Sequence, residues 1–376
     1  MDQTTLPRPD AASVQPALFE LLARSWTPGA AVTSLCFDRA GATVAFALAD
    51  GRIALAALTD AEPPEKRIRQ EVDTGRTTIR PRDKALPPLA MTEALEDGPA
   101  RIVASNSHGF LVAGRFGQIF RVTPRGQVLR LLKGTQPVSA LATDGQGRFA
   151  IAQETGVTLY DETDLVPFQS LPARCRADGL HFLPDGELAI ASEQGLLLWR
   201  PGSPPERHPV QAEGAMAIAT DGGWLGGATR SGGLWLMQRN SHHIAQIGNF
   251  RAPPGSTSFS APSGAVFASG AFRIAGWSLQ DAPFTSDATG ALRNGRPGLV
   301  LIDTVAAHPD RPLVAAGSAD GAVVVAQIGQ PDEMLLRHAS GSPVTALCWS
   351  ANGAHLALGT AAGDAAIVTF PPHLFK

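Results

Sequence analysis

Short runs of alternating apolar and polar residues recur along the whole chain, and most of them end in a polar turn that contains glycine. Residues 32–38 form one such run, and a turn ending in Gly41 follows it. Residues 344–350 repeat the pattern and lead to Gly353. Alternation with a period of two predicts β-strands, and close glycine turns between strands predict antiparallel hairpins.

Eight units with this organisation follow one another, each with three strands and a fourth that leads into the next unit. They cover residues 32–58, 101–122, 138–160, 179–199, 215–237, 257–277, 304–325 and 344–368. Dividing 376 residues by 8 gives 47 per unit, and a repeat of this length made of short strands is typical of β-propeller blades. We predict an all-β fold in which residues 1–376 form a single closed β-propeller of eight blades. Seven blades are the alternative, because residues 105–109 shorten the first strand of the second unit.

The closure of the ring depends on the N-terminal segment, because the last unit ends almost at the C-terminus without a fourth strand of its own. The apolar run at residues 17–22 precedes the first unit, where a fourth strand would be expected. We predict that this run is a strand that completes the last blade and so removes an exposed sheet edge. A short helix is the alternative, because Pro16 precedes the run and proline favours the start of a helix.

Two long segments interrupt the repeat. Residues 60–97 carry charges of both signs and several prolines, and residues 281–298 form a second insertion. Part of the first insertion must supply the fourth strand of the first blade, and residues 67–72 are the predicted strand. Long loops in a compact domain are usually functional or disordered. The charged insertion is therefore either an electrostatic arm for a protein partner or a solvated linker.

The composition argues against several classes of partner. The 31 basic and 34 acidic residues give a net charge of -3, which would not draw the protein to nucleic acid or to an anionic membrane. No stretch of 18 apolar residues occurs, and the first ten residues lack the features of a secretory signal. Three cysteines do not suggest a disulfide framework. We therefore expect a cytoplasmic protein that is monomeric outside its complex with a partner protein.

The repeat resembles the WD40 family. Residues 344–350 (Val-Thr-Ala-Leu-Cys-Trp-Ser) have the apolar, small and aromatic positions of the first strand of that repeat, and residues 32–38 match it as well. The Asp–Gly turn of the family is present at Asp50 and Asp320. The terminal Trp–Asp pair is degenerate, and Tyr160-Asp161 is among the nearest matches.

The resemblance covers nearly the whole chain, and residues 307–323 look like a group of alphaproteobacterial cytoplasmic WD40 proteins. It implies a non-enzymatic scaffold that holds protein partners on one face and around the rim of the central channel. Some members of the group are encoded beside a zinc-linked GTPase. The alternative function implied by the resemblance is therefore zinc handling or assistance to a metal-linked GTPase.

One charged residue lies in the turn between the second and third strands of each unit, and in a propeller these turns project from one face. The eight residues are Asp50, Arg115, Glu154, Glu193, Arg230, Arg273, Asp320 and Asp364. Charges of both signs on one face could bind loops of a partner protein through charge-assisted hydrogen bonds. We predict that this ring is the partner-binding site. The alternative is that they are solvated turn residues, or acceptors for nearby donors in the case of Asp50 and Asp320.

The sequence contains no recognised catalytic or cofactor-binding motif. No serine has the Gly-x-Ser-x-Gly context of a hydrolase nucleophile, and the glycine-rich runs stand between strands, where no helix could cradle a phosphate. We therefore predict no catalytic residue, no cofactor and no enzymatic activity.

Metal binding and thiol chemistry have little support in the sequence. The nine histidines are scattered, and the adjacent pair His242 and His243 would point to opposite sides of a regular strand. No metal site is predicted, although distant residues can converge in a ring. Cys36 and Cys348 occupy the same position in neighbouring units, where we expect two core thiols, with a disulfide or a shared metal as the alternative. The acids at 161–162 are expected to be solvated.

Overall fold

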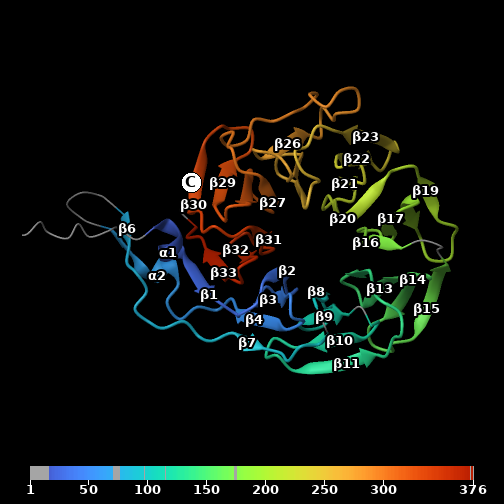
Figure 1. The fold of residues 1–376 in the computed structure, drawn as a ribbon, viewed down its shortest axis with the longest axis horizontal. Helices are drawn as coiled ribbons and strands as arrows, with labels where there is room; N and C mark the ends of the chain where they lie inside the picture. The colour runs from blue at the N-terminus through green and yellow to red at the C-terminus, as the bar shows by residue number, and fades with distance from the viewer. Residues whose placement is uncertain are drawn as a thin grey trace, which may run out of the picture.

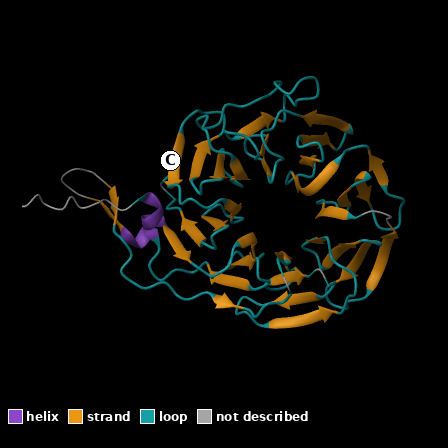
Figure 2. Ribbon diagram, viewed as in Figure 1, coloured by secondary structure: helices purple, strands orange, loops and turns teal. Residues whose placement is uncertain are grey.

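The strands of this chain form a ring of blades. The computed structural model describes residues 17–70, 77–96, 98–114, 116–172, 176–372 and 374–375. Within these residues eight sheets stand side by side around a common centre, with the first strand of each sheet innermost (Figure 1). Nearly all of the regular structure is strand (Figure 2). The predicted all-β propeller of eight blades is confirmed, and the seven-bladed alternative is wrong.

Blades 1 to 4 are antiparallel sheets of four strands each. Blade 1 contains β2 (Val32–Phe37), β3 (Thr43–Leu48), β4 (Ile53–Ala57) and β7 (Ala90–Met91). Blade 2 contains β8 (Arg101–Ala104), β9 (Phe110–Ala113), β10 (Ile119–Val122) and β11 (Val128–Leu132). Blade 3 contains β12 (Ala140–Thr143), β13 (Arg148–Gln153), β14 (Gly156–Asp161) and β15 (Pro167–Pro172). Blade 4 contains β16 (Ala177–Phe182), β17 (Leu188–Ser192), β18 (Gly195–Trp199) and β19 (Glu206–His208).

Blades 5 to 8 continue the ring, and the last blade takes its fourth strand from the N-terminal part of the chain. Blade 5 contains β20 (Ala212–Ile218), β21 (Trp224–Thr229), β22 (Leu234–Gln238) and β23 (His243–Ile247). Blade 6 contains β24 (Thr257–Ser260), β25 (Ala265–Ala268) and β26 (Ala275–Ser278). Blade 7 contains β27 (Ile302–Ala307), β28 (Leu313–Ser318), β29 (Val323–Gln327) and β30 (Glu333–Arg337). Blade 8 contains β31 (Val344–Trp349), β32 (His355–Thr360), β33 (Ala365–Thr369) and β1 (Ala23–Trp26).

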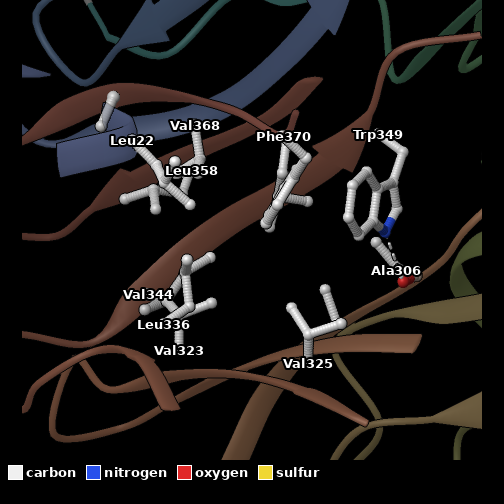
Figure 3. Packing of buried hydrophobic residues seen from close by; sticks show 13 residues of the cluster. Leu22, Ala306, Val323, Val325, Leu336, Val344, Trp349, Leu358, Val368 and Phe370 are labelled. Atoms are coloured by element: carbon white, nitrogen blue, oxygen red, sulfur yellow. Dashed lines mark hydrogen bonds between the residues drawn. The ribbon is translucent and has the colours of Figure 1, made fainter. Parts of the chain in front are cut away.

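Apolar clusters between neighbouring blades form the core. Figure 3 shows the cluster between blades 7 and 8, in which Val325 of β29 packs with Trp349 and Phe370. The indole Nε1 of Trp349 donates a hydrogen bond to the carbonyl oxygen of Ala306 at 3.1 Å. The polar atom of this buried ring is thereby satisfied, as buried tryptophans require.

Glycines in the second strands let adjacent blades approach closely. A Cβ atom at Gly359 of β32 would lie 2.3 Å from Cγ1 of Val32, which begins the first strand of blade 1. A Cβ atom at Gly317 of β28 would lie 2.6 Å from Cβ of Val344, which begins the first strand of blade 8. Both valines are fully buried. The same glycine–valine packing therefore repeats at two successive blade interfaces.

The ring closes through β1, which pairs with β33 from Ala23 opposite Val368 to Trp26 opposite Ala365. The prediction of closure is correct, but the prediction that residues 17–22 form the strand is wrong. Those residues contain α1 (Leu18–Leu22), because apolar side chains four residues apart place one face against blades 7 and 8, where Leu22 is buried. No helix in the described part of the chain is long and apolar enough to cross a bilayer.

A buried arginine holds the closing strand to blade 1. Arg24 of β1 is 1% exposed, and its guanidinium donates hydrogen bonds to the carbonyl oxygens of Ala57 at 2.9 Å and Leu58 at 3.2 Å. Burial lowers the pKa of Arg24, and the nearby Asp60 carboxylate partly offsets this effect. The last and first blades are thus joined by polar contacts as well as by apolar packing.

The fourth strand of blade 1 is β7, in which Ala90 and Met91 pair with β4. The prediction that residues 67–72 form this strand is wrong. Those residues include β5 (Ile68–Gln70), which pairs with β6 (Thr77–Ile79) in a separate hairpin that follows α2 (Pro64–Arg67); residues 71–72 lie outside the described residues. The physical reason is that Ala90 and Met91 pack against the apolar clusters on the two sides of blade 1, whereas the charges of the insertion pair with one another.

The charged insertion packs against the outside of the ring near α1. Arg67 is 2% exposed, and it donates to the carbonyl oxygens of Leu21 at 2.5 Å and Arg80 at 2.6 Å. Glu62 accepts from Arg80 at 2.5 Å and from the backbone N–H of Lys84 at 3.0 Å. This part of the insertion is consequently a folded appendage held by an ion-pair network.

Blade 6 has three regular strands in the described residues. The insertion at 281–298 covers its outer edge, where two isolated bridges join Ile274 with Asn294 and Trp277 with Ala291. The indole of Trp277 donates to the carbonyl oxygen of Asp287 at 2.8 Å. The second insertion thus takes the place of a fourth strand.

Glu162 lies between blades 2 and 3, and the expectation that it is solvated is wrong. Glu162 is only 5% exposed to solvent. It accepts hydrogen bonds from the hydroxyl of Ser105, from the backbone N–H of Asn106 at 2.9 Å and from Arg121 at 2.8 Å. The polar turn that interrupts blade 2 in the sequence therefore supplies the donors for a buried carboxylate of blade 3.

Candidate partner-binding face

The predicted charged residues occupy equivalent places in the fold. Seven of the eight lie in the turn between the second and third strands of their blades, and Arg115 lies outside the described residues. Because strands alternate in direction, these turns share one face with the connections from each blade to the next. We call this face the turn face.

Asp50 and Asp320 stabilise their own turns. Asp50 accepts from the side-chain Nε of Arg52 at 2.7 Å and from the Arg52 backbone N–H at 3.2 Å, and the side-chain bond is the main reason that the pKa of Asp50 is lowered. Asp320 accepts from Ser318 at 2.6 Å and from the N–H of Ala322 at 3.1 Å. The hydrogen bond from Ser318 is the main cause of the lowered pKa of Asp320. These contacts match the alternative interpretation of both residues as acceptors for nearby donors.

Asp364, Glu193 and Arg230 join neighbouring blades. Arg337 donates to Asp364 at 2.7 Å and to the carbonyl oxygen of Gly321 at 3.0 Å, which links blade 7 to blade 8. Glu193 of blade 4 lies 3.4 Å from the guanidinium of Arg230 of blade 5. Since both members of the second pair are more than half exposed, solvent screens their attraction and a partner could compete for either charge.

Arg273 belongs to a mixed apolar and cationic surface on blade 6. Phe272 is 40% exposed and Leu299 is 94% exposed, and the N–H of Gly298 donates to the carbonyl oxygen of Phe272 at 2.8 Å. The guanidinium of Arg251 lies 6.0 Å from the centre of the Phe272 ring. We call Phe272, Leu299 and the half-exposed Val300 the apolar patch.

A cavity of about 870 Å³ opens among the turns and connections of blades 1 to 4. Two predicted residues, Glu154 and Glu193, line it together with Glu96, Arg101 and Arg176. Arg176 also pairs with Asp178 at 2.8 Å. The cavity therefore brings three acidic and two basic side chains of the turn face together.

Glu96, Arg101 and Arg176 could not be found from the turns, because they lie on the connections between blades or at the start of a first strand. Arg101 begins β8, and Arg176 stands directly before β16. The position of Arg101 and Arg176 at the start of a first strand was the available signal, since that end of a first strand lies on the same face as the turns.

Cys36 and Cys348 are free thiols and are each partly buried. Burial raises the pKa of both, that of Cys348 to about 11, and the neighbouring Cys348 raises the pKa of Cys36 further. The protonated thiol is therefore the favoured form of both groups. On another part of the molecule, Glu206, His208 and His242 form a group among the described residues that could hold a metal ion.

The fold and this face define a class of protein, namely a closed β-propeller that presents a loop-rich surface around its centre. The sequence matches no protein-family model and no curated protein. Solved structures similar to it include the computationally designed Ika8 protein, with a TM-score of 0.62 and 14% identity over 92% of this chain and 98% of that chain.

Two WD40 structures are also similar. The C-terminal WD40 domain of Sif2 has a TM-score of 0.62 and 13% identity over 91% of this chain and 96% of that chain. The WD40 repeats of RRP9 have a TM-score of 0.53 and 13% identity over 95% of this chain and 99% of that chain. Identity at this level shows the fold alone. The chain therefore has the fold of a WD40 β-propeller domain, as the repeat pattern indicated.

Proposed function

We propose that this chain is a non-catalytic scaffold that binds a protein partner on its turn face. The observation that carries this proposal is the presence, on one face, of the charged cavity of blades 1 to 4 and the apolar patch of blade 6. Exposed aromatic side chains beside arginine are characteristic of the residues that dominate protein–protein binding.

The turn face is held in place before any partner binds. Asp50, Asp320 and Asp364 each accept a side-chain hydrogen bond within the turn in which they lie, from Arg52, Ser318 and Thr360 respectively. A partner would therefore meet ordered turns, and the entropy cost of binding is reduced accordingly. In this proposal those three residues shape the face, while Glu154 and Arg273 contact the partner.

The mixed charge of the face favours a protein over a nucleic acid. Three carboxylates, Glu96, Glu154 and Glu193, line the cavity, and carboxylates repel the phosphates that dominate nucleic-acid affinity. A protein can present charges of both signs in a matching arrangement. Both insertions serve as accessory surfaces in this proposal, because Glu96 belongs to the first and Gly298 contacts Phe272 from the end of the second.

The test is partner capture by a variant of the apolar patch and its arginine. Phe272→Ala combined with Arg273→Glu removes an exposed ring and reverses an exposed charge on the turn face. The immobilised wild-type chain is used to isolate its partner from the source cells, and the purified partner is then titrated against both forms. We expect binding to weaken at least about tenfold, or about 1.4 kcal/mol.

The matched control is Phe168→Ala combined with Arg125→Glu. Phe168 is 47% exposed on the outer strand β15, and Arg125 is exposed in the turn between β10 and β11, on the opposite face. This control should bind the partner as the wild type does. Equal binding by wild type and the turn-face variant, with loss in the control, would overturn the proposal.

A further inference from the structure

Two histidines and a glutamate from different blades converge at the outer edge of the ring. Glu206 and His208 lie two residues apart on β19 of blade 4, so that their side chains share one side of the strand. His242 stands in the turn before β23 of blade 5. One donor atom from each of the three lies within 4.8 Å of the others.

The distances suit a metal ion with short bonds. Nε2 of His208 lies 3.5 Å and Nδ1 of His242 lies 2.9 Å from the same oxygen, Oε1 of Glu206. Ligand atoms at the corners of a tetrahedron around zinc stand about 3.4 Å apart, given bonds of about 2.0–2.1 Å. Small side-chain rotations would therefore bring all three donors to bonding distance of one ion.

His208 supplies an independent indication of a ligand. The residue is 5% exposed, and its Nε2 atom is buried without a hydrogen-bond partner among the described residues. A buried ring nitrogen without a partner is unusual, because such atoms are nearly always satisfied.

Other side chains of ligand type close to the three residues, among those that the structure describes, have contacts of their own. The nearby carboxylates Asp185 and Glu187 are paired with Arg239 at 2.5 Å and 2.8 Å. The adjacent His243 packs edge-on against Phe284 instead, with ring centres 5.5 Å apart. The sequence places His242 beside His243, but the convergence of His242 with Glu206 and His208 of blade 4 was not visible in it.

We propose that Glu206, His208 and His242 bind one divalent transition-metal ion of the zinc class. Two imidazoles and one carboxylate are a ligand set that zinc accepts, with a fourth position left for solvent. Both Glu206 and His242 are about half exposed, which leaves the ion an entry path. The ion would link the outer strand of blade 4 to blade 5, on the face opposite the turn face, so the proposal stands apart from partner binding.

The test uses the untagged full-length chain after removal of metal by a chelator. Zinc chloride is titrated into the wild type and into His242→Gly and Glu206→Gln in a calorimeter, and Co²⁺ is added in parallel to record its visible absorption. Glycine suits position 242 because the backbone there has φ 56. His243→Ala is the matched control, since it removes the neighbouring imidazole.

We expect one zinc ion per wild-type chain and the intense absorption of four-coordinate Co²⁺. Zinc binding should weaken at least about tenfold in His242→Gly and in Glu206→Gln, because even the loss of a residue that only hydrogen-bonds to a metal ligand weakens metal binding by that factor. Zinc binding should be unchanged in His243→Ala. Thermal unfolding without metal confirms that each variant is folded. Absence of zinc binding by the wild type, or equal binding by His242→Gly, would overturn the proposal.

Discussion

Glu162 illustrates how one buried carboxylate can join two blades of a repeat protein. Its oxygens accept hydrogen bonds from Ser105, Asn106 and Arg121, all in blade 2 or its turn. Burial acts to raise the pKa of Glu162, but these hydrogen bonds outweigh it and lower the pKa below its ordinary value of 4.5. The charged form is therefore the one that stabilises the contact between the blades.

We expect Glu162→Gln to lower the free energy of unfolding by about 2–3 kcal/mol at pH 7, because Arg121 loses its charged acceptor. The loss should be complete above pH 4.5, the unfolded-state value, and should shrink as the pH falls through the lower folded-state value. Urea unfolding of both forms between pH 3 and pH 7 measures this. Glu154→Gln, at an exposed glutamate, serves as the control and should change stability by less than about 0.5 kcal/mol. A pH-independent difference would contradict the account.

At the scale of the element, the first three strands of each blade were predictable and the fourth strands were not. Inner strands such as β3 are covered on both faces, so their sequences are continuous apolar and small runs bounded by glycine turns. The fourth strand has only one hydrogen-bonded neighbour and is partly solvated. β7 has just two residues, and β1 follows a helix that takes up the apolar run expected to be the strand. Such segments carry no periodic signal.

The glycine in the second strand of blade 8 gives an element-scale prediction. We expect Gly359→Ala to lower stability by about 1–3 kcal/mol, because its Cβ would lie 2.3 Å from Val32 of the next blade. Gly248→Ala is the control, since the nearest atom there lies at 3.8 Å. Chemical denaturation of the single variants and of Gly359→Ala with Val32→Ala completes a double-mutant cycle. If the two substitutions were additive, the proposed contact would not be the cause.

At the scale of the whole molecule, closure and the common direction of the turns were predictable because they follow from the repeat. The turn face could be predicted as a ring of charged positions, but the roles within it could not. Asp320 fixes its own turn, whereas Arg273 stays exposed. These different roles depend on contacts that form only in the folded ring. The contact between Glu206 of blade 4 and His242 of blade 5 could not be predicted from the sequence for the same reason.

Hydrogen exchange of the isolated complex shows directly whether the partner binds on the turn face. We expect slower exchange on binding at residues 269–274 of blade 6, at 298–302 where the chain enters blade 7, and at 153–156 of blade 3. Residues 123–127 and 239–242, in turns of the opposite face, should exchange as in the free chain. Protection confined to the opposite face, with residues 269–274 and 298–302 unchanged, would show that the partner does not bind on the turn face.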